Sequence, residues 1–301
     1  MAAGPTNSKI ENIVCSFKIL RIYRPLLAIL LACVTGTACS DEPTTASVMA
    51  ALEESDWRQP DPANLLYMRL PQGEVVIELA PDFAPVNVAN IKTLVKEEYF
   101  DGLAIIRSQD NYVVQWGDPA EEDQARPFGS ASATAAPEFF RALDGLEVTT
   151  LDSRDAYANT VGFADGFPVG SDGERAWLTH CYGMVGVARG NEPNSGNGSS
   201  LYVITGHAPR HLDRNITLAG RVLSGIEYLT TLPRGTGSLG FYESAGEKNQ
   251  LNPAALFAAP LGLNVDADSF QKGAWQDAAR RYDDGIISDR LHLISNRDFH
   301  Y

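Results

Sequence analysis

Histidine and cysteine side chains are the first places to look for covalent or metal chemistry in this sequence. His207 and His211 are spaced like two metal ligands on one helix face, but Pro209 lies between them and would disrupt that helix. We therefore favour two loop histidines over a zinc pair. The chain contains neither a Gly-x-Ser-x-Gly elbow nor a His-Glu-x-x-His motif, and residues 183–186 are not followed by the lysine of a phosphate-binding loop. The sequence predicts no metal site and no organic cofactor.

Short apolar segments separated by turn residues dominate the middle of the chain. Residues 67–70 and 74–79 alternate polar and apolar side chains across a Pro-Gln-Gly turn, which predicts a β-hairpin. A helix is expected to begin at Pro85, because the apolar residues that follow recur at helical spacing. Further strands are expected at residues 103–107, 112–115, 184–188, 201–205 and 217–222. The fold class is therefore mainly β, a sandwich or a barrel.

Two long segments do not fit this pattern of short strands. Residues 119–179 are rich in turn residues, and a structureless loop of that length is uncommon in a compact domain. We expect a partly helical insertion there, with a helix at 137–143. Residues 243–301 are expected to form a C-terminal extension that includes a helix at 269–282.

Two blocks of sequence carry a specific resemblance to a known family. The first block reads GEVVIELAPDFAP at 73–85, YFDG at 99–102, Arg107, and YVVQWGDP at 112–119. The second reads GMVGVARG at 183–190, NGSSLYVIT at 197–205, HLD at 211–213 and GRV at 220–222. In this order the blocks resemble the cyclophilin-type peptidyl-prolyl cis-trans isomerases over residues 65–242. The resemblance implies a closed eight-stranded antiparallel barrel with two capping helices, and an active-site groove on the outside of the barrel.

The resemblance also implies an isomerase and assigns roles to individual side chains. Arg107 matches the catalytic arginine, and Gln115 matches the glutamine that helps to hold the substrate backbone. The positions that match substrate-binding residues are Tyr112, Val113, Ala188, Arg189, Ser200, Tyr202, His211 and Leu212. Such a reaction needs no nucleophile, because an X-Pro bond only has to rotate over a resonance barrier of about 18–20 kcal/mol. It needs an apolar cup for the proline ring and a fixed donor for the twisting amide, which a guanidinium supplies.

The chain departs from the family pattern at several groove positions. Ile105 and Ile106 replace the usual Phe-His before the arginine, and Ser200 stands where glutamine is common. His211 replaces a frequent tryptophan, and Ile216 replaces a histidine or an aromatic residue. The groove is therefore expected to keep its catalytic pair but to lose polar support. Two alternatives stay open: a module that binds proline-containing segments with little turnover, and an envelope scaffold whose insertion and tail bind a partner.

The N-terminal region has the pattern of an export signal. Four basic residues, Lys9, Lys18, Arg21 and Arg24, precede an apolar run at residues 25–34. This run is shorter than the roughly 20 residues that span a bilayer, and small residues follow it. Residues 1–38 are therefore predicted to be a signal peptide.

The residues after this segment resemble the start of a mature bacterial lipoprotein. Cys39 is the preferred lipidation site, Cys33 is the alternative, and ordinary cleavage after Ala38 is a third possibility. Residues 39–62 are expected to form a flexible tether with a short helix near 47–54. The predicted location is the cell envelope of a Gram-negative bacterium, as a periplasm-facing lipoprotein of the outer membrane, with the domain proper at 63–242.

Charge and cysteine content narrow the range of partners. The chain has 38 acidic and 24 basic residues and a formal net charge of −14, which disfavours a nucleic-acid partner because phosphate binding needs a basic surface. Of the four cysteines, Cys181 alone lies in the globular region, so no disulfide framework is expected. The predicted partners are proline-containing segments of exported proteins, together with a membrane reached through the N-terminal lipid.

Overall fold

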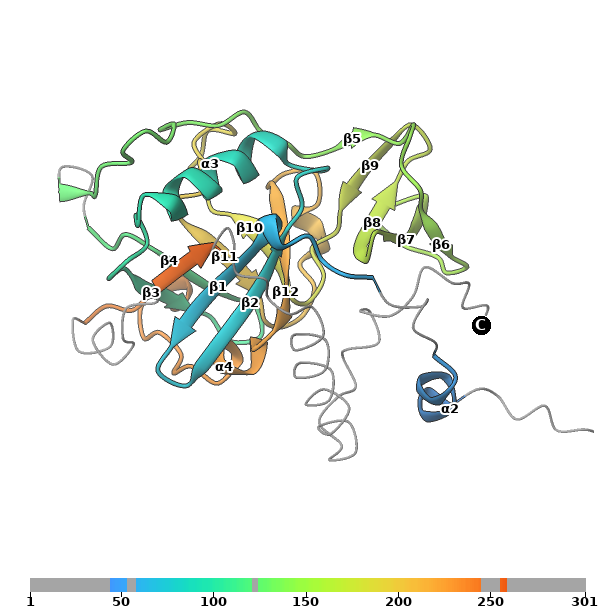
Figure 1. Ribbon diagram of the computed structural model, residues 1–301, viewed down its shortest axis with the longest axis horizontal. Helices are drawn as coiled ribbons and strands as arrows, with labels where there is room; N and C mark the ends of the chain where they lie inside the picture. The colour runs from blue at the N-terminus through green and yellow to red at the C-terminus, as the bar shows by residue number, and fades with distance from the viewer. Residues whose placement is uncertain (1–43, 53–57, 121–123, 245–254, 259–301) are drawn as a thin grey trace, which may run out of the picture. The chain divides into compact units, whose positions relative to one another are not determined.

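The computed structural model describes residues 44–52, 58–120, 124–244 and 255–258 (Figure 1). The short helix expected near 47–54 is present as α2 (Thr45–Ala50), in a separate N-terminal unit that ends at Leu52. The predicted signal peptide, both candidate lipidation sites and the helix expected at 269–282 lie outside the described residues. Within the described ranges, no helix has the length and hydropathy needed to cross a membrane.

The larger unit is built on an eight-stranded antiparallel sheet, which confirms the mainly β fold. In spatial order its strands are β13 (Ala255–Ala258), β1 (Leu65–Leu70), β2 (Gly73–Leu79), β12 (Leu218–Ser224), β10 (Met184–Val187), β11 (Leu201–Ile204), β4 (Val113–Gly117) and β3 (Ala104–Ser108). Every strand expected from the sequence is present. The edge strand β13 lies beyond residue 242, where the domain was expected to end, and pairs with β1 over residues 66–69.

Alternate residues of these strands face one apolar core. Met68 of β1, Ile77 of β2, Ile105 of β3 and Trp116 of β4 all belong to it, and each is at most 2% exposed. Because strands as far apart in the sheet as β1 and β3 share this core, the sheet must curl around it. No ladder joins β3 to β13 in the described part of the chain, so closure of the barrel remains a prediction.

Two helices cover this core, as expected. The first, α3 (Pro85–Lys96), starts with proline in its first turn and turns Val88, Ile91, Leu94 and Val95 inward. Figure 1 shows α3 lying across one opening of the curled sheet. The second, α4 (Ile226–Thr230), contributes the fully buried Leu229. The described residues also include the 3-10 turns η3 (Pro62–Asn64), η5 (Arg210–Leu212) and η6 (Ser238–Gly240).

The insertion forms a second sheet of five antiparallel strands. Their spatial order is β5 (Arg141–Ala142), β9 (Arg175–Leu178), β8 (Phe167–Ser171), β7 (Thr160–Ala164) and β6 (Thr149–Leu151). Figure 1 shows this sheet standing beside the larger one. A second apolar cluster fills the contact between them, with Phe167 and Val169 from the insertion against Met184 and Ile204 from the outer face of the larger sheet. Strands β10 and β11 are therefore buried on both faces, which explains their continuous apolar sequences.

The helix expected at 137–143 is absent, and that prediction was wrong. Residues 137–140 form no regular structure, and Arg141 and Ala142 pair with β9. The Glu138 carboxylate accepts the backbone N–H groups of Val86 and Asn87 at 2.9 Å each, at the start of α3. Glu138 therefore satisfies two backbone N–H groups in the first turn of α3, which have no partner within that helix. A helix at 137–143 would have formed only its own internal hydrogen bonds.

Candidate active site

A β-bulge aims Arg107 out of the core. Ile105 pairs with Trp116 and Arg107 pairs with Gln115, so Ile106 is left without a partner on β4. One extra residue reverses the alternation of side chains along a strand. Without the bulge, Arg107 would share the inward face of the fully buried Ile105. With it, Arg107 lies on the outer face together with Gln115.

Four cross-strand neighbours form a row on this outer face. Arg107 of β3 is paired with Gln115 of β4, Gln115 with Tyr202 of β11, and Tyr202 with Gly186 of β10. A Cβ atom on Gly186 would lie 2.2 Å from Cζ of Tyr202, so the tyrosine ring crosses β10 where the strand has no side chain. The row therefore places a charged guanidinium at one end and a buried aromatic ring at the other.

The Arg107 guanidinium is held by its neighbours. Its Nε donates to the carbonyl oxygen of Leu239 at 2.7 Å, and its Nη2 donates to Oε1 of Gln109. Its Cζ atom lies 5.6 Å from the ring centroid of Tyr112 and 5.2 Å from that of Phe241, which is cation–π range. Burial lowers the pKa of Arg107, but arginine starts so far above neutrality that the group stays charged.

Gln115 connects the arginine to the neighbouring strand. Nη1 of Arg107 lies 3.5 Å from Oε1 of Gln115, and Nε2 of Gln115 donates to Oγ of Ser200 at 3.1 Å. The Ser200 hydroxyl in turn donates to the carbonyl oxygen of Trp116 at 3.2 Å. Ser200 thus fixes the orientation of Gln115, even though its side chain is shorter than the glutamine common at this position.

The structure brings several of the predicted substrate-binding residues together in one apolar cluster. Val113 and Tyr202 belong to the second apolar cluster, and Tyr112, Ala188 and Ile216 pack against it. These residues come from β4, β11 and the segments next to β10 and β12. An apolar ring resting on this cluster would lie beside the Arg107 donors. The arrangement can therefore hold a small apolar ring and present a fixed positive donor next to it.

The remaining predicted residues lie around this cluster in different settings. His211 and Leu212 are on η5, the first exposed and the second half-buried. Arg189 is half-buried and donates to the backbone oxygens of Gly190, Asn191 and Asn215, as well as to Oδ1 of Asn215. In this conformation Arg189 braces two loops, and its contact with a substrate remains a prediction.

Several residues of the site were not found from the sequence. Gln109, Leu239 and Phe241 contact Arg107, and the last two come from a segment more than 130 residues further along the chain. His180 is fully buried and bonded to Tyr202. In the described ranges no three His, Cys, Asp or Glu side chains gather closely enough to hold a metal ion.

Acid is expected to destabilise the fold through His180. Burial lowers the pKa of this imidazole below its usual 6.5, and this outweighs the opposing effect of Asp213. The imidazole is therefore protonated more readily in the unfolded chain than in the native state. The free energy of unfolding should fall as pH drops below about 6.5, by at most about 1.4 kcal/mol per pH unit. The polar and charged groups around the His180 imidazole are Asp213, Tyr202, Arg210 and His211. Urea unfolding at pH 7.5 and 5.5 should show a smaller decline in His180→Gln than in the parent chain, and equal declines would contradict this.

Comparison with known proteins relates the chain to peptidyl-prolyl isomerases. The family model for cyclophilin type peptidyl-prolyl cis-trans isomerase/CLD matches residues 65–246. A Brucella suis protein described as a probable peptidyl-prolyl cis-trans isomerase is 26% identical over 176 residues, which cover 58% of this chain and 74% of that protein. A Synechocystis protein described as a thylakoid lumen isomerase of the same type is 26% identical over 189 residues, covering 60% of this chain and 47% of that protein. The crystal structure of a cyclophilin from Hirschia baltica is 28% identical, with a TM-score of 0.53, and the match covers 72% of this chain and 79% of that one.

Proposed function

Because the chain belongs to the cyclophilin-type peptidyl-prolyl cis-trans isomerase family, we propose that it accelerates X-Pro rotation in exported proteins and thereby assists their folding in the cell envelope. The observation that supports this most is the placement of Arg107. It lies on the outer face, beside an apolar cluster, with its guanidinium held by Gln109 and by the backbone of Leu239. A guanidinium has five N–H donors, so these contacts leave others for a substrate.

The proposed mechanism is preferential binding of the twisted amide. When the C–N bond of X-Pro rotates, resonance is lost and the proline nitrogen gains a basic lone pair. A fixed guanidinium can donate to this lone pair and to a nearby carbonyl oxygen, so it stabilises the twisted state more than either planar state. The apolar cluster of Val113 and Tyr202 holds the pyrrolidine ring, and Gln115 aligns the substrate backbone. No group on the protein has to accept or donate a proton fully.

Catalysed isomerisation of a short X-Pro peptide by the full chain is the direct test. Uncatalysed X-Pro isomerisation takes about tens to hundreds of seconds, and we expect the protein to shorten this time substantially. Proline-peptide affinity without acceleration would favour the alternative of a binding module with little turnover. That alternative is motivated by Ile216 and Ser200, which replace larger polar or aromatic groups of the family pattern.

An apolar shelf beside Arg107 is proposed to favour an apolar residue next to the isomerised bond. Leu239 is 62% exposed and accepts from the guanidinium through its carbonyl oxygen, and Phe241, which is 37% exposed, has its ring centroid 5.2 Å from Cζ of Arg107. Phe241→Ala is expected to lower kcat/KM roughly three- to tenfold for peptides with leucine or phenylalanine beside the X-Pro pair. Peptides with glycine there should be affected much less. A parallel assay of both peptide series measures this, and an equal loss in both would remove the shelf as a specificity element.

Export and lipid attachment are part of the same proposal. The basic segment and apolar run of the first 38 residues support export, and so does the lumenal description of the Synechocystis relative. Incorporation of labelled palmitate in a bacterial host should be lost in Cys39→Ser and retained in Cys33→Ser. The reverse result would move the attachment site to Cys33, and an unlabelled secreted chain would favour simple cleavage after Ala38.

A further inference from the structure

We propose that the insertion holds the proline pocket in its active shape through a relay of buried polar contacts. The relay consists, from the insertion inward, of Asp155, Arg210, Asp213, His180 and Tyr202. This inference deepens the isomerase function proposed above and rests on it. It makes Asp155, Arg210 and His180 positioning residues, because none of them belongs to the predicted substrate-contacting set.

The inner end of the relay fixes the Tyr202 ring, which belongs to the apolar cluster of the candidate proline pocket. The Asp213 carboxylate accepts the Nδ1–H of His180 at 2.9 Å and the His180 backbone N–H at 2.8 Å. A carboxylate cannot donate, so Nδ1 carries the proton and Nε2 is left as an acceptor. The Tyr202 hydroxyl lies 3.0 Å from Nε2 and is therefore the donor. The aromatic ring of Tyr202 is thus held at its far end as well as by packing.

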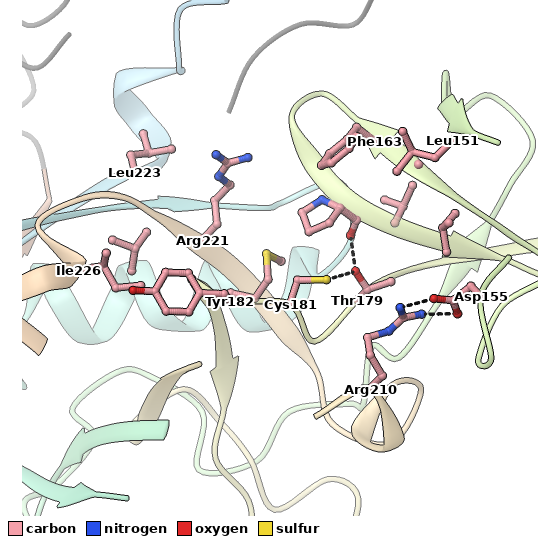
Figure 2. A pocket seen from close by; sticks show the side chains of 17 residues that line it. Leu151, Asp155, Phe163, Thr179, Cys181, Tyr182, Arg210, Arg221, Leu223 and Ile226 are labelled. Carbon is pink, nitrogen blue, oxygen red and sulfur yellow. Dashed lines mark hydrogen bonds and ion pairs between the residues drawn. The ribbon is translucent and has the colours of Figure 1, made fainter. Parts of the chain in front are cut away.

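The outer end of the relay fixes η5, the turn that carries two of the predicted substrate-binding residues. Arg210 donates from Nε to Oδ2 of Asp213 at 2.6 Å, and from both terminal nitrogens to the Asp155 carboxylate at 2.6 and 2.9 Å. Figure 2 shows this paired Arg210–Asp155 contact beside a cavity of about 200 Å³. Residues of both sheets line this cavity, which is distinct from the candidate proline pocket. Arg210 begins η5, the turn that carries His211 and Leu212. Asp155 of the insertion therefore restrains the turn that carries Leu212, one of the predicted substrate-binding residues.

The relay is largely buried, so the loss of any one contact is expected to disturb its neighbours. The exposed fraction of the side chain increases from 0% at His180 and 2% at Asp213 to 14% at Arg210 and 17% at Asp155. A buried polar group that loses its partner is destabilised more than an exposed one, so the members hold one another in place. A change at the half-buried outer end can thereby reach the Tyr202 ring without any contact with the substrate.

The test compares Asp155→Asn and Tyr202→Phe, which remove a charge and a hydroxyl with almost no change in shape. Each is expected to lower kcat/KM for an X-Pro peptide about two- to tenfold, the equivalent of one hydrogen bond. The double variant should lose less than the product of the two single losses, because both act on one network. Asp155→Glu, which keeps the charge, should retain more activity than Asp155→Asn.

Asp172→Asn is the matched control. Asp172 belongs to the same insertion, where its carboxylate pairs with Arg175 at 2.7 Å and accepts the backbone N–H groups of Glu174 and Arg175. The methyl NMR signals of Leu212 give a readout that needs no activity: they should shift in Asp155→Asn and stay in place in Asp172→Asn. If the two variants agree in both kcat/KM and Leu212 signals, the relay is overturned. An inactive parent chain would instead count against the isomerase function, while the Leu212 comparison still decides the relay.

Discussion

Replacing Arg107 with alanine is expected to lower kcat/KM for X-Pro isomerisation about 10²- to 10³-fold, the loss typical of one pre-organised donor in an active site. The guanidinium is the one charged group in the row of cross-strand neighbours, and the bulge at Ile106 aims it at the apolar cluster. Its contacts with Gln109 and the Leu239 backbone fix it before a substrate arrives. The fixed geometry matters because donors that need no rearrangement stabilise the twisted amide most. A protease-coupled or NMR exchange assay on one peptide, with parent and variant side by side, measures the loss.

The controls separate turnover from binding and from general stability. Arg69→Ala removes another strand arginine, one that lies 3.5 Å from Glu74 on the hairpin, and should leave kcat/KM unchanged. Arg107→Lys keeps the charge but not the fork of donors, so an intermediate rate is expected. The dissociation constant of a proline peptide should change little in Arg107→Ala. Unchanged turnover would remove Arg107 from catalysis, and an equal loss of affinity and turnover would favour a binding role.

The strands could be predicted because their signals are local. Alternating side chains in 67–70 and 74–79 give the hairpin directly. The pairing of Arg107 with Gln115 depends on the bulge at Ile106, which the sequence pattern did not predict. The insertion was different. Glu138 lies in a segment with moderate helix preference, and its distant partners Val86, Asn87 and Thr217 stabilise a non-helical conformation instead. No pattern within the segment itself reports on those partners.

The surroundings of the catalytic pair also depend on distant contacts. The carbonyl oxygen of Leu239 and the ring of Phe241 reach Arg107 through the C-terminal part of the domain, in a region with no regular periodicity. The replacement at Ser200 suggested lost polar support, yet its hydroxyl bonds Gln115 at 3.1 Å. Gln115 is therefore still oriented by a hydrogen bond, which the shorter side chain of Ser200 supplies. Sequence comparison position by position identifies such a change but not its compensation.

Replacing Gly186 with alanine is expected to lower the free energy of unfolding by about 2–4 kcal/mol, from overpacking together with a lost buried hydrogen bond. The new Cβ would lie 2.2 Å from Cζ and 2.3 Å from the hydroxyl oxygen of Tyr202. The ring cannot move aside freely, because its hydroxyl is bonded to the fully buried His180. The ring must leave its place at the pocket floor, so isomerase activity should fall along with stability. Urea unfolding and the peptide assay on the same preparation measure both effects.

A double-mutant cycle decides whether Tyr202 is the cause. Tyr202→Leu removes the ring that Gly186→Ala would strike, so the pair should be less destabilised than the sum of the single changes, by about 0.5–3 kcal/mol. Activity should stay low in the double variant, since the pocket floor is missing. Gly190→Ala is the matched control: its Cβ would lie no closer than 3.4 Å to any neighbour, so only a small change is expected. Additive losses in the cycle would mean that Gly186 is needed for β10 itself and that the tyrosine ring does not depend on it. Coupled losses would instead show that glycine is needed at position 186 because any larger side chain would overlap the Tyr202 ring.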